Sequence, residues 1–114
     1  MSENLAQLEI AREGNTILAT LTGEIDISNS KLLEQEIKDS VSQAGKVIVD
    51  LSPLGFMDSQ GVRLIHNLAS HLSSQGVGFE IVAPAESIAG QVLHLTKMDE
   101  LVSVRETLAS STDG

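Results

Sequence analysis

The segment that most constrains the fold is the run at residues 46–51, which reads Lys-Val-Ile-Val-Asp-Leu and is rich in β-branched residues. Apolar and polar residues alternate little within it, which is typical of a strand covered on both faces. A stretch with helical spacing follows at 59–75, and a second β-like run follows at 77–82. A strand, a helix and a strand in this order predict a βαβ unit, whose crossover is almost always right-handed.

The residues before this unit predict a β-hairpin and a helix. Apolar and polar residues alternate over 5–10 and over 16–22, with a turn signal at 13–15 between them. The following helix is expected to be capped by Ser28 or Ser30, because either hydroxyl oxygen can accept a free backbone N–H. The predicted helix has apolar residues at Leu33, Ile37, Val41 and Ala44, and it ends at Gly45.

The C-terminal half predicts two further helices and a short strand. A loop is expected at 52–55, then the helix that follows Ser59, then a helix over 86–95. A strand over 101–103 and a last helical turn over 105–109 complete the prediction. The apolar faces of the two helices are Val62, Ile65, Leu68, Ala69 and Leu72 in the first, and Ile88, Val92 and Leu95 in the second.

These elements predict an α/β fold in which a mixed sheet of four or five strands packs against three to four helices. A chain of 114 residues has the length of one domain. We therefore expect a single domain over 1–110 and a frayed polar tail over 111–114.

Composition excludes several classes of function. The net charge is −9, and the seven basic residues are scattered singly, so nothing in the sequence favours nucleic-acid binding. The chain has no cysteine, which rules out disulfides, thiolate catalysis and cysteine-based zinc sites. No apolar run is long enough to span a membrane, and the first residues do not resemble a signal peptide. A cytoplasmic protein that does not associate with membranes is expected.

The tetrapeptide Asp58-Ser59-Gln60-Gly61 stands where the central helix begins and has two interpretations. In the first, Asp58 or Ser59 caps the helix by accepting free N–H groups, a contribution of about 1 kcal/mol. In the second, Ser59 accepts a phosphate, which the positive end of a helix tolerates. Gly61 in the first turn lowers helix propensity, and its missing side chain would let a partner's backbone approach closely.

Catalytic and metal chemistry find little support in the sequence. Ser59 has a glycine two residues after it but not two before it, so only half of a nucleophile elbow is present. His66 lies about two helical turns further on and cannot activate Ser59 from the same helix. Asp50 ends a strand as in phospho-accepting receiver domains, but the first strand ends without the acidic pair that binds Mg²⁺. We expect no enzymatic activity, no metal site and no cofactor.

The order and spacing of several segments resemble the STAS domain family, and in particular its small stand-alone anti-sigma factor antagonists. The segment 21–26, Leu-Thr-Gly-Glu-Ile-Asp, is similar to the family's strand end, and 47–52 is similar to its central strand. The likeness is sharpest at 56–62, where the family has Phe-x-Asp-Ser-(Ser/Thr)-Gly-(Leu/Val) and this chain has Phe-Met-Asp-Ser-Gln-Gly-Val.

This resemblance implies that Ser59 is phosphorylated by a cognate anti-sigma factor that is also a serine kinase. The unphosphorylated protein would bind the kinase and release the sigma factor, and a PP2C-type phosphatase would reset the phosphorylated form. Gln60 departs from the family's usual Ser or Thr, which leaves the choice of partner open. The residues expected to support the switch are Asp26, Asp58 and Gly61, and those expected to contact the partner are Glu24, Ser28, Met57, Gln60 and Arg63. An alternative within the family is a STAS subunit of a transport or lipid-trafficking complex, without a phosphoserine switch.

Overall fold

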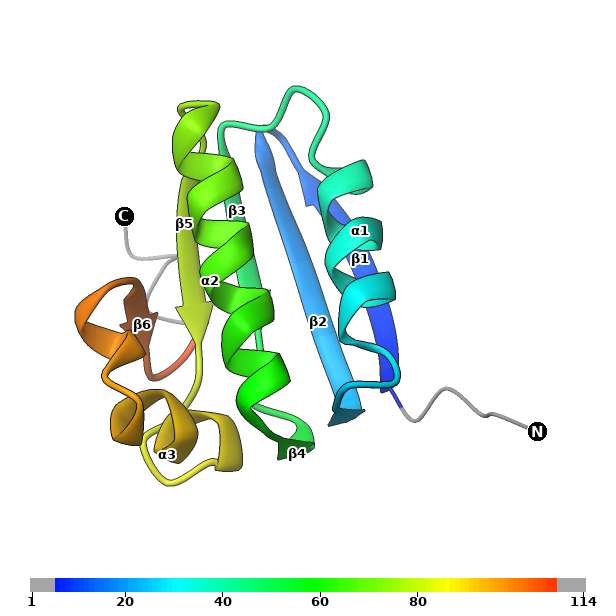
Figure 1. The fold of residues 1–114 in the computed structure, drawn as a ribbon. Coiled ribbons are helices and arrows are strands. Elements are labelled where there is room, and N and C mark those ends of the chain that lie inside the picture. Colours follow the sequence, from blue (N-terminus) through cyan, green and yellow to red (C-terminus); the bar gives the residue numbers. More distant parts are fainter. Residues whose placement is uncertain (1–5, 109–114) are drawn as a thin grey trace.

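The computed structural model describes residues 6–108, and within that range six strands form one mixed sheet. The strand order is β1-β2-β3-β5-β6, and β4 pairs with β2 outside this path. Helices α1 and α2 lie side by side on one face of the sheet (Figure 1). The elements are β1 (Ala6–Glu13), β2 (Thr16–Ile25), α1 (Ser30–Ser40), β3 (Lys46–Asp50), β4 (Leu54–Met57), α2 (Ser59–Ser74), β5 (Gly78–Val82), α3 (Ile88–Leu95), the 3-10 helix η1 (Met98–Glu100) and β6 (Ser103–Arg105).

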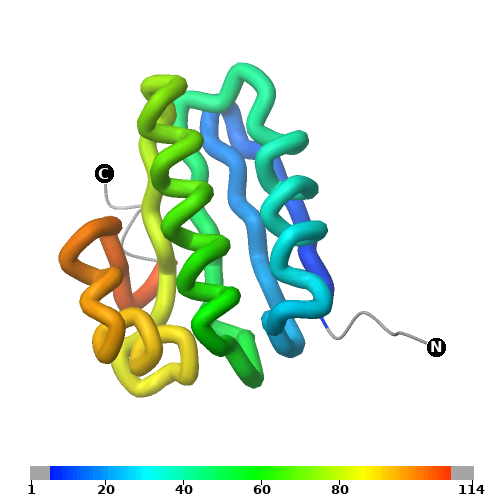
Figure 2. Tube along the Cα trace, viewed as in Figure 1, coloured from blue at the N-terminus to red at the C-terminus, as the bar shows by residue number. Residues whose placement is uncertain are grey.

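The predicted hairpin and βαβ unit are both confirmed. β1 and β2 pair antiparallel around a turn in which Gly14 has φ of +58°, a conformation that glycine adopts at no steric cost. β3 and β5 lie next to each other and parallel, joined through α2 (Figure 2). The α/β class is therefore as expected, and the sheet has one strand more than the four or five that were predicted.

The core lies between the sheet and the two long helices. Alternate residues of β2, namely Ile17, Ala19 and Leu21, are at most 2% exposed, because successive side chains of a strand point to opposite faces. Ile48 of β3 is also buried, although its neighbours Val47 and Val49 occupy the opposite face. The central strand is thus covered on both faces, as its unbroken apolar run predicts. The helices contribute buried side chains from Leu33, Ile37, Leu64, Ile65, Leu68 and Leu72.

The predicted end and cap of the first helix are wrong. α1 ends at Ser40, and Val41 and Ala44 lie beyond it in a turn where Gln43 has φ of +61°. Both apolar residues remain buried, so their apolar character reflects contact with the core and not helical structure. The cap position is occupied by Asn29 instead of Ser28 or Ser30.

Two segments near the sheet edges also differ from their predictions. Residues 54–57, partly assigned to a loop, form β4 because the end of β2 extends past β3 and offers free pairing positions to a further strand. The last strand spans Ser103–Arg105 instead of 101–103, and residues 105–108 form no helix. Residue 109 and the predicted tail lie outside the described residues, so the expected domain limit at 110 stays a prediction.

Of the three residues expected to form the packed apolar face of helix α3, Val92 is partly buried against the core, but the fully buried residues lie on a different face. Ala89, Gly90 and Leu93 are buried, whereas Ile88 is 42% and Leu95 is 80% exposed. The reason is a close backbone contact: a Cβ placed on Gly90 would lie 2.0 Å from the Pro84 carbonyl oxygen. The smallest side chain therefore sets which face of α3 approaches the rest of the protein.

Candidate functional site

The pairing of β2 with β4 brings the two ends of the candidate site together. In their parallel register Glu24 lies opposite Phe56, and Ile25 lies opposite Met57. The next residues along the two strands are Asp26 and Asp58. Because neighbouring strands lie about 4.8 Å apart, the loop after β2 and the start of α2 share one edge of the sheet. The strand beside this end of β2 is β4, since β3 pairs only with the earlier residues 16–20 of β2.

The start of α2 shows whether Ser59 is the helix cap, one of the two roles that the sequence left open for it. Asp58 is the cap, and its side chain accepts a hydrogen bond from the Gln60 N–H at 2.8 Å. Its carbonyl oxygen accepts from the Gly61 N–H at 2.9 Å. Ser59 is the first residue of the helix, is exposed, and its hydroxyl makes no hydrogen bond with any of residues 6–108. The cap is thus provided without the serine hydroxyl, which stays accessible.

Gly61 is required by internal packing, which corrects the expectation that it admits a partner's backbone. The residue is buried, and a Cβ built on it would lie 2.2 Å from Met57 Cγ and 2.9 Å from Met57 Sδ. Met57 itself is only 3% exposed. The Met57 side chain therefore fills the space that Gly61 leaves. This corrects the prediction that Met57 contacts a partner. Both residues instead fix the position of the first turn of α2 against β4.

The loop after β2 is held by side chains of its own. The Asp26 carboxylate accepts hydrogen bonds from the Ser28 hydroxyl at 2.5 Å and from the Ser28 N–H at 2.8 Å. These two bonds stabilise the charged form and lower the pKa of Asp26. Asp26 therefore carries its negative charge at neutral pH, and the hydroxyl of Ser28 is already occupied.

Asn29 is a residue of the site that the sequence interpretation missed. It is 4% exposed, and its side chain donates to the Glu24 carbonyl at 2.9 Å and accepts from the Asp26 N–H at 3.1 Å. A buried amide at the end of a loop that hydrogen-bonds to two backbone groups at its start fixes the loop's shape. The spacing of Asp26 and Asn29 is a weak sequence signal for such a turn, because either residue could equally cap the helix.

Exposed apolar side chains on the two segments that meet at this edge of the sheet were also missed. Phe56, at the end of β4, is 44% exposed, and Ile27, at the tip of the loop after β2, is 77% exposed. Glu24 is exposed beside Phe56 in the paired strands. Large apolar side chains grouped at one edge are typical of a protein interaction surface. We refer to Glu24, Ile27, Phe56 and Ser59 as the switch surface.

A polar groove between α1 and α2 contains the other predicted contact residues. It has a volume of about 380 Å³ and includes Gln60 and Arg63, with Glu34 and Asn67 further along. Burial would raise the pKa of Glu34, but hydrogen bonds from Lys38 and Asn67 and the charges of Lys38 and Arg63 together lower it. Arg63 is exposed at this groove, one helical turn from Ser59, so a partner that covers the switch surface could reach it.

The remaining candidates have structural explanations. The Asp50 carboxylate accepts hydrogen bonds from the N–H and the hydroxyl of Ser52, so it closes the turn after β3. Within residues 6–108 no group of three or more acidic or histidine side chains is arranged to hold a metal ion. Over the same range, no helix combines the length and the hydrophobicity that crossing a membrane requires.

Comparison with known proteins places the whole fold in one family. The family model described as the STAS domain matches residues 7–111. A Thermotoga maritima protein, described as a candidate anti-sigma factor antagonist, is 29% identical over 92 residues, which cover 79% of this chain and 80% of that protein. Its Thermotoga neapolitana homologue is 28% identical over the same shares of the two chains.

Solved structures agree on the fold. The crystal structure of an anti-sigma factor antagonist from Mycobacterium paratuberculosis superposes with a TM-score of 0.84 at 24% identity, covering 95% of this chain and 92% of that one. SpoIIAA in its unphosphorylated form superposes with a TM-score of 0.75 at 18% identity, covering 94% of each chain. The Bacillus SpoIIAA in its phosphorylated form gives 0.70 at 18% identity, covering 94% of this chain and 97% of that one.

Proposed function

This chain belongs to the STAS domain family, and from that membership we propose that it is an anti-sigma factor antagonist controlled by phosphorylation of Ser59. In its unphosphorylated form it binds a serine-kinase anti-sigma factor and thereby releases a sigma factor. Its relatives described as anti-sigma factor antagonists support the class of partner. SpoIIAA, whose structure is similar to this one, has been solved in an unphosphorylated and a phosphorylated form, which supports a phosphorylation switch.

The observation that carries the proposal is the accessible Ser59 hydroxyl at the first position of α2. Because Asp58 caps the helix, a phosphate on Ser59 would not remove a stabilising hydrogen bond. The exposed N–H end of the helix favours the added negative charge within the free protein. The fold is therefore expected to persist after modification.

The chemical step requires nothing catalytic from this chain. The hydroxyl oxygen of Ser59 forms a bond to the γ-phosphorus of ATP, the bond between that phosphorus and the bridging oxygen breaks, and ADP leaves. The hydroxyl proton passes to a base of the kinase, which also brings Mg²⁺. Hydrolysis of the phosphoserine by a PP2C-type phosphatase restores the hydroxyl and releases inorganic phosphate.

Phosphorylation switches binding off through charge at the centre of the contact. The modification adds about −1.5 to −2 charge at neutral pH beside Asp58 and at the same sheet edge as Asp26, both of which are carboxylates. A partner that docks on Ile27 and Phe56 must dehydrate this edge, and dehydration of an unpaired phosphate is costly. Contacts at Glu24, Ser28, Gln60 and Arg63 would then decide which kinase binds.

The first experiment is to incubate the protein with candidate kinase anti-sigma factors and ATP and to map any added phosphate by mass spectrometry. Labelling is expected at Ser59 in the wild-type protein and in Ser73→Ala, a matched change at an exposed serine of the same helix. It is expected to be lost in Ser59→Ala. Failure to label Ser59 with every kinase tried, together with wild-type behaviour of Ser59→Ala in a sigma-release assay, would contradict the switch.

The second experiment measures partner affinity. Ser59→Asp should give the amide NMR spectrum of a folded protein but lose kinase binding. Phe56→Ser, which removes an exposed apolar group, should weaken binding by at least about fivefold, the effect of an interface residue worth 1 kcal/mol. Leu101→Ser is the matched control, since Leu101 is 71% exposed in the turn before β6. If the two substitutions weakened binding equally, the switch surface would not be the docking site.

A further inference from the structure

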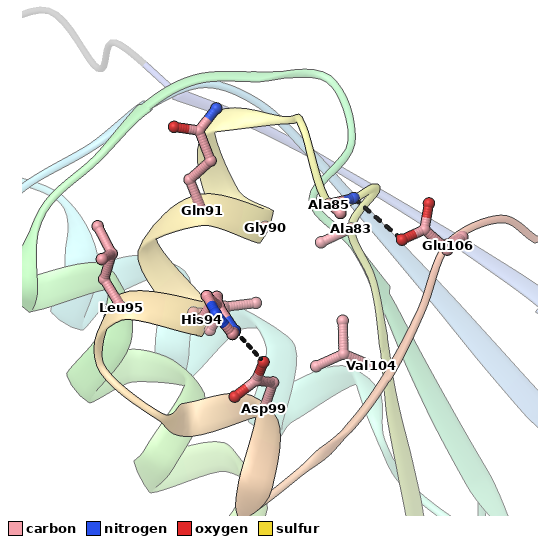
Figure 3. Close-up of a pocket in the computed structure, with 10 residues that line it drawn as sticks. Ala83, Ala85, Gly90, Gln91, His94, Leu95, Asp99, Val104 and Glu106 are labelled. Carbon is pink, nitrogen blue, oxygen red and sulfur yellow. Dashed lines mark hydrogen bonds and ion pairs between the residues drawn. The ribbon is translucent and has the colours of Figure 1, made fainter.

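The polar groove between α1 and α2 differs in charge from the larger cavity between α3 and β6. That cavity, of about 580 Å³, has Asp99 and Glu106 among its lining residues and neither lysine nor arginine (Figure 3). The groove is lined by two cations, Lys31 and Arg63, and by one carboxylate, Glu34. In a chain with a net charge of −9, the groove is therefore a local concentration of positive charge, and it reaches the first turn of α2.

The guanidinium of Arg63 has donors to spare. Arg63 is exposed, and no hydrogen bond or ion pair joins its guanidinium to any of residues 6–108. The one carboxylate of the groove, Glu34, is engaged through both oxygens. One oxygen accepts from Lys38 Nζ at 2.7 Å, and the other accepts from Asn67 Nδ2 at 3.0 Å. Arg63 therefore lies at the groove as a cation that the described part of the chain leaves unpaired.

Helical geometry brings Arg63 to Ser59. Both residues belong to α2 and stand four positions apart, and such residues are neighbours on a helix surface, with Cβ atoms about 5–6 Å from each other. The side chains of a helix lean toward its N-terminus, so the long side chain of Arg63 extends over the turn that begins with Ser59. Both residues are exposed, so neither has to leave the core for their side chains to meet.

We propose that Arg63 binds the phosphate of phosphorylated Ser59 within the same molecule, an inference that rests on the proposed phosphorylation of that residue. A guanidinium and a phosphate form two parallel N–H···O bonds, which are charge-assisted and among the stronger hydrogen bonds of proteins. The neighbouring Asp58 carboxylate is already engaged, because it accepts from the Gln60 N–H at 2.8 Å. The positive end of the α2 dipole favours the same negative charge, so the phosphate is bound from two sides.

This ion pair gives the modification a second way to end partner binding. In the unphosphorylated protein the donors of Arg63 are available to a partner that covers the groove. In the phosphorylated protein the same donors are engaged by the phosphate. The partner therefore loses a cation contact in the same step in which it meets the added negative charge.

The test is a ³¹P NMR pH titration of protein in which phosphoserine is built into position 59 during synthesis, so that no kinase is needed. The second ionisation of phosphoserine has a pKa of about 6. Arg63 stabilises the dianion, so this pKa should rise by about 0.5 unit in Arg63→Gln. Arg63→Lys keeps the charge without the planar fork and should recover part of the difference. Arg12→Gln makes the same substitution at the opposite end of β2 and should leave the pKa unchanged.

The arginine side chains give a second readout. The chain has three arginines, so their guanidinium N–H signals can be assigned by substitution in ¹⁵N-labelled protein. With phosphoserine at position 59, the Arg63 signal should shift and exchange more slowly with water, and those of Arg12 and Arg105 should not. An unchanged Arg63 signal, or an equal rise of the phosphate pKa in Arg63→Gln and Arg12→Gln, would overturn the proposal.

The two proposals for this site fail in different ways. Loss of the ion pair would leave labelling of Ser59 by a kinase unaffected. Absence of labelling by every kinase would contradict the proposed function, whereas the ion pair would still be measurable in the protein made with phosphoserine.

Discussion

Replacing Gly61 by alanine adds one methyl group at the junction between β4 and α2 and tests how the first turn of the helix is held. The new Cβ would lie 2.2 Å from Met57 Cγ, far inside normal contact. Met57 is 3% exposed and has little room to move. Overpacking of this kind costs about 1–3 kcal/mol. Alanine regains about 1 kcal/mol of helix propensity, so we expect Gly61→Ala to destabilise the protein by about 1 kcal/mol.

The cause of that loss is identified by a double-mutant cycle with Met57→Ala. Truncation of Met57 alone should cost about 2–5 kcal/mol, because it leaves a cavity in the core. In that background the methyl group of Gly61→Ala has space, so the second substitution should stabilise the protein by up to about 1 kcal/mol. The coupling free energy between positions 57 and 61 is therefore about 2 kcal/mol. Gly61→Ala destabilises the wild-type protein but stabilises the Met57→Ala variant.

Urea unfolding followed by circular dichroism is the suitable assay, since the chain has neither tryptophan nor tyrosine to report by fluorescence. The propensity term is measured separately at Ser70, an exposed position of the same helix, by comparing Ser70→Gly with Ser70→Ala. If Gly61→Ala changes stability equally in both backgrounds, or stabilises the wild-type protein, then Met57 is not what requires glycine at this position.

Substitutions at three other positions test the supports of the site. Asn29→Ala should destabilise by about 2 kcal/mol, because it removes hydrogen bonds to the backbone of Glu24 and Asp26; a loss under about 0.5 kcal/mol in urea unfolding would contradict that role. Asp58→Ala should cost about 1 kcal/mol in thermal unfolding by removing the cap, while Asp58→Asn should retain most of it. The folded pKa of Glu34 lies below its ordinary value of 4.5, so its contribution is present above that pH and is lost as the pH falls through the folded pKa. Glu34→Gln should thus show a shallower loss of stability in acid, and identical acid profiles for the two proteins would refute the pKa shift.

Local patterns predicted the elements that depend on local chemistry. The hairpin follows from alternation on either side of Gly14, and the βαβ unit follows from the run at 46–51 with the helix and strand after it. The start of α2 was also predictable, because acidic and hydroxyl side chains cap helices wherever they stand. Ser59 could therefore be identified as the candidate phosphoacceptor from the sequence alone.

Predictions failed where distant segments decide the outcome. β4 is a strand because β2 extends beyond β3 and leaves positions to pair, a condition that residues 54–57 do not encode. α3 turns its Ile88 and Leu95 outward because Gly90 meets the backbone at Pro84. The spacing of apolar residues on a helix gives its periodicity, but close contacts between elements select the face that is buried.

The sequence by itself determined the α/β class and the serine at the mouth of α2, because periodicity and helix capping act over a few neighbouring residues. Only the tertiary structure decided that Asp58 is the cap, that the Ser59 hydroxyl has no internal partner, and that Gly61 makes room for Met57. Those outcomes depend on burial and on contacts between β4 and α2, and the distances between side chains that produce them exist only once the chain has folded.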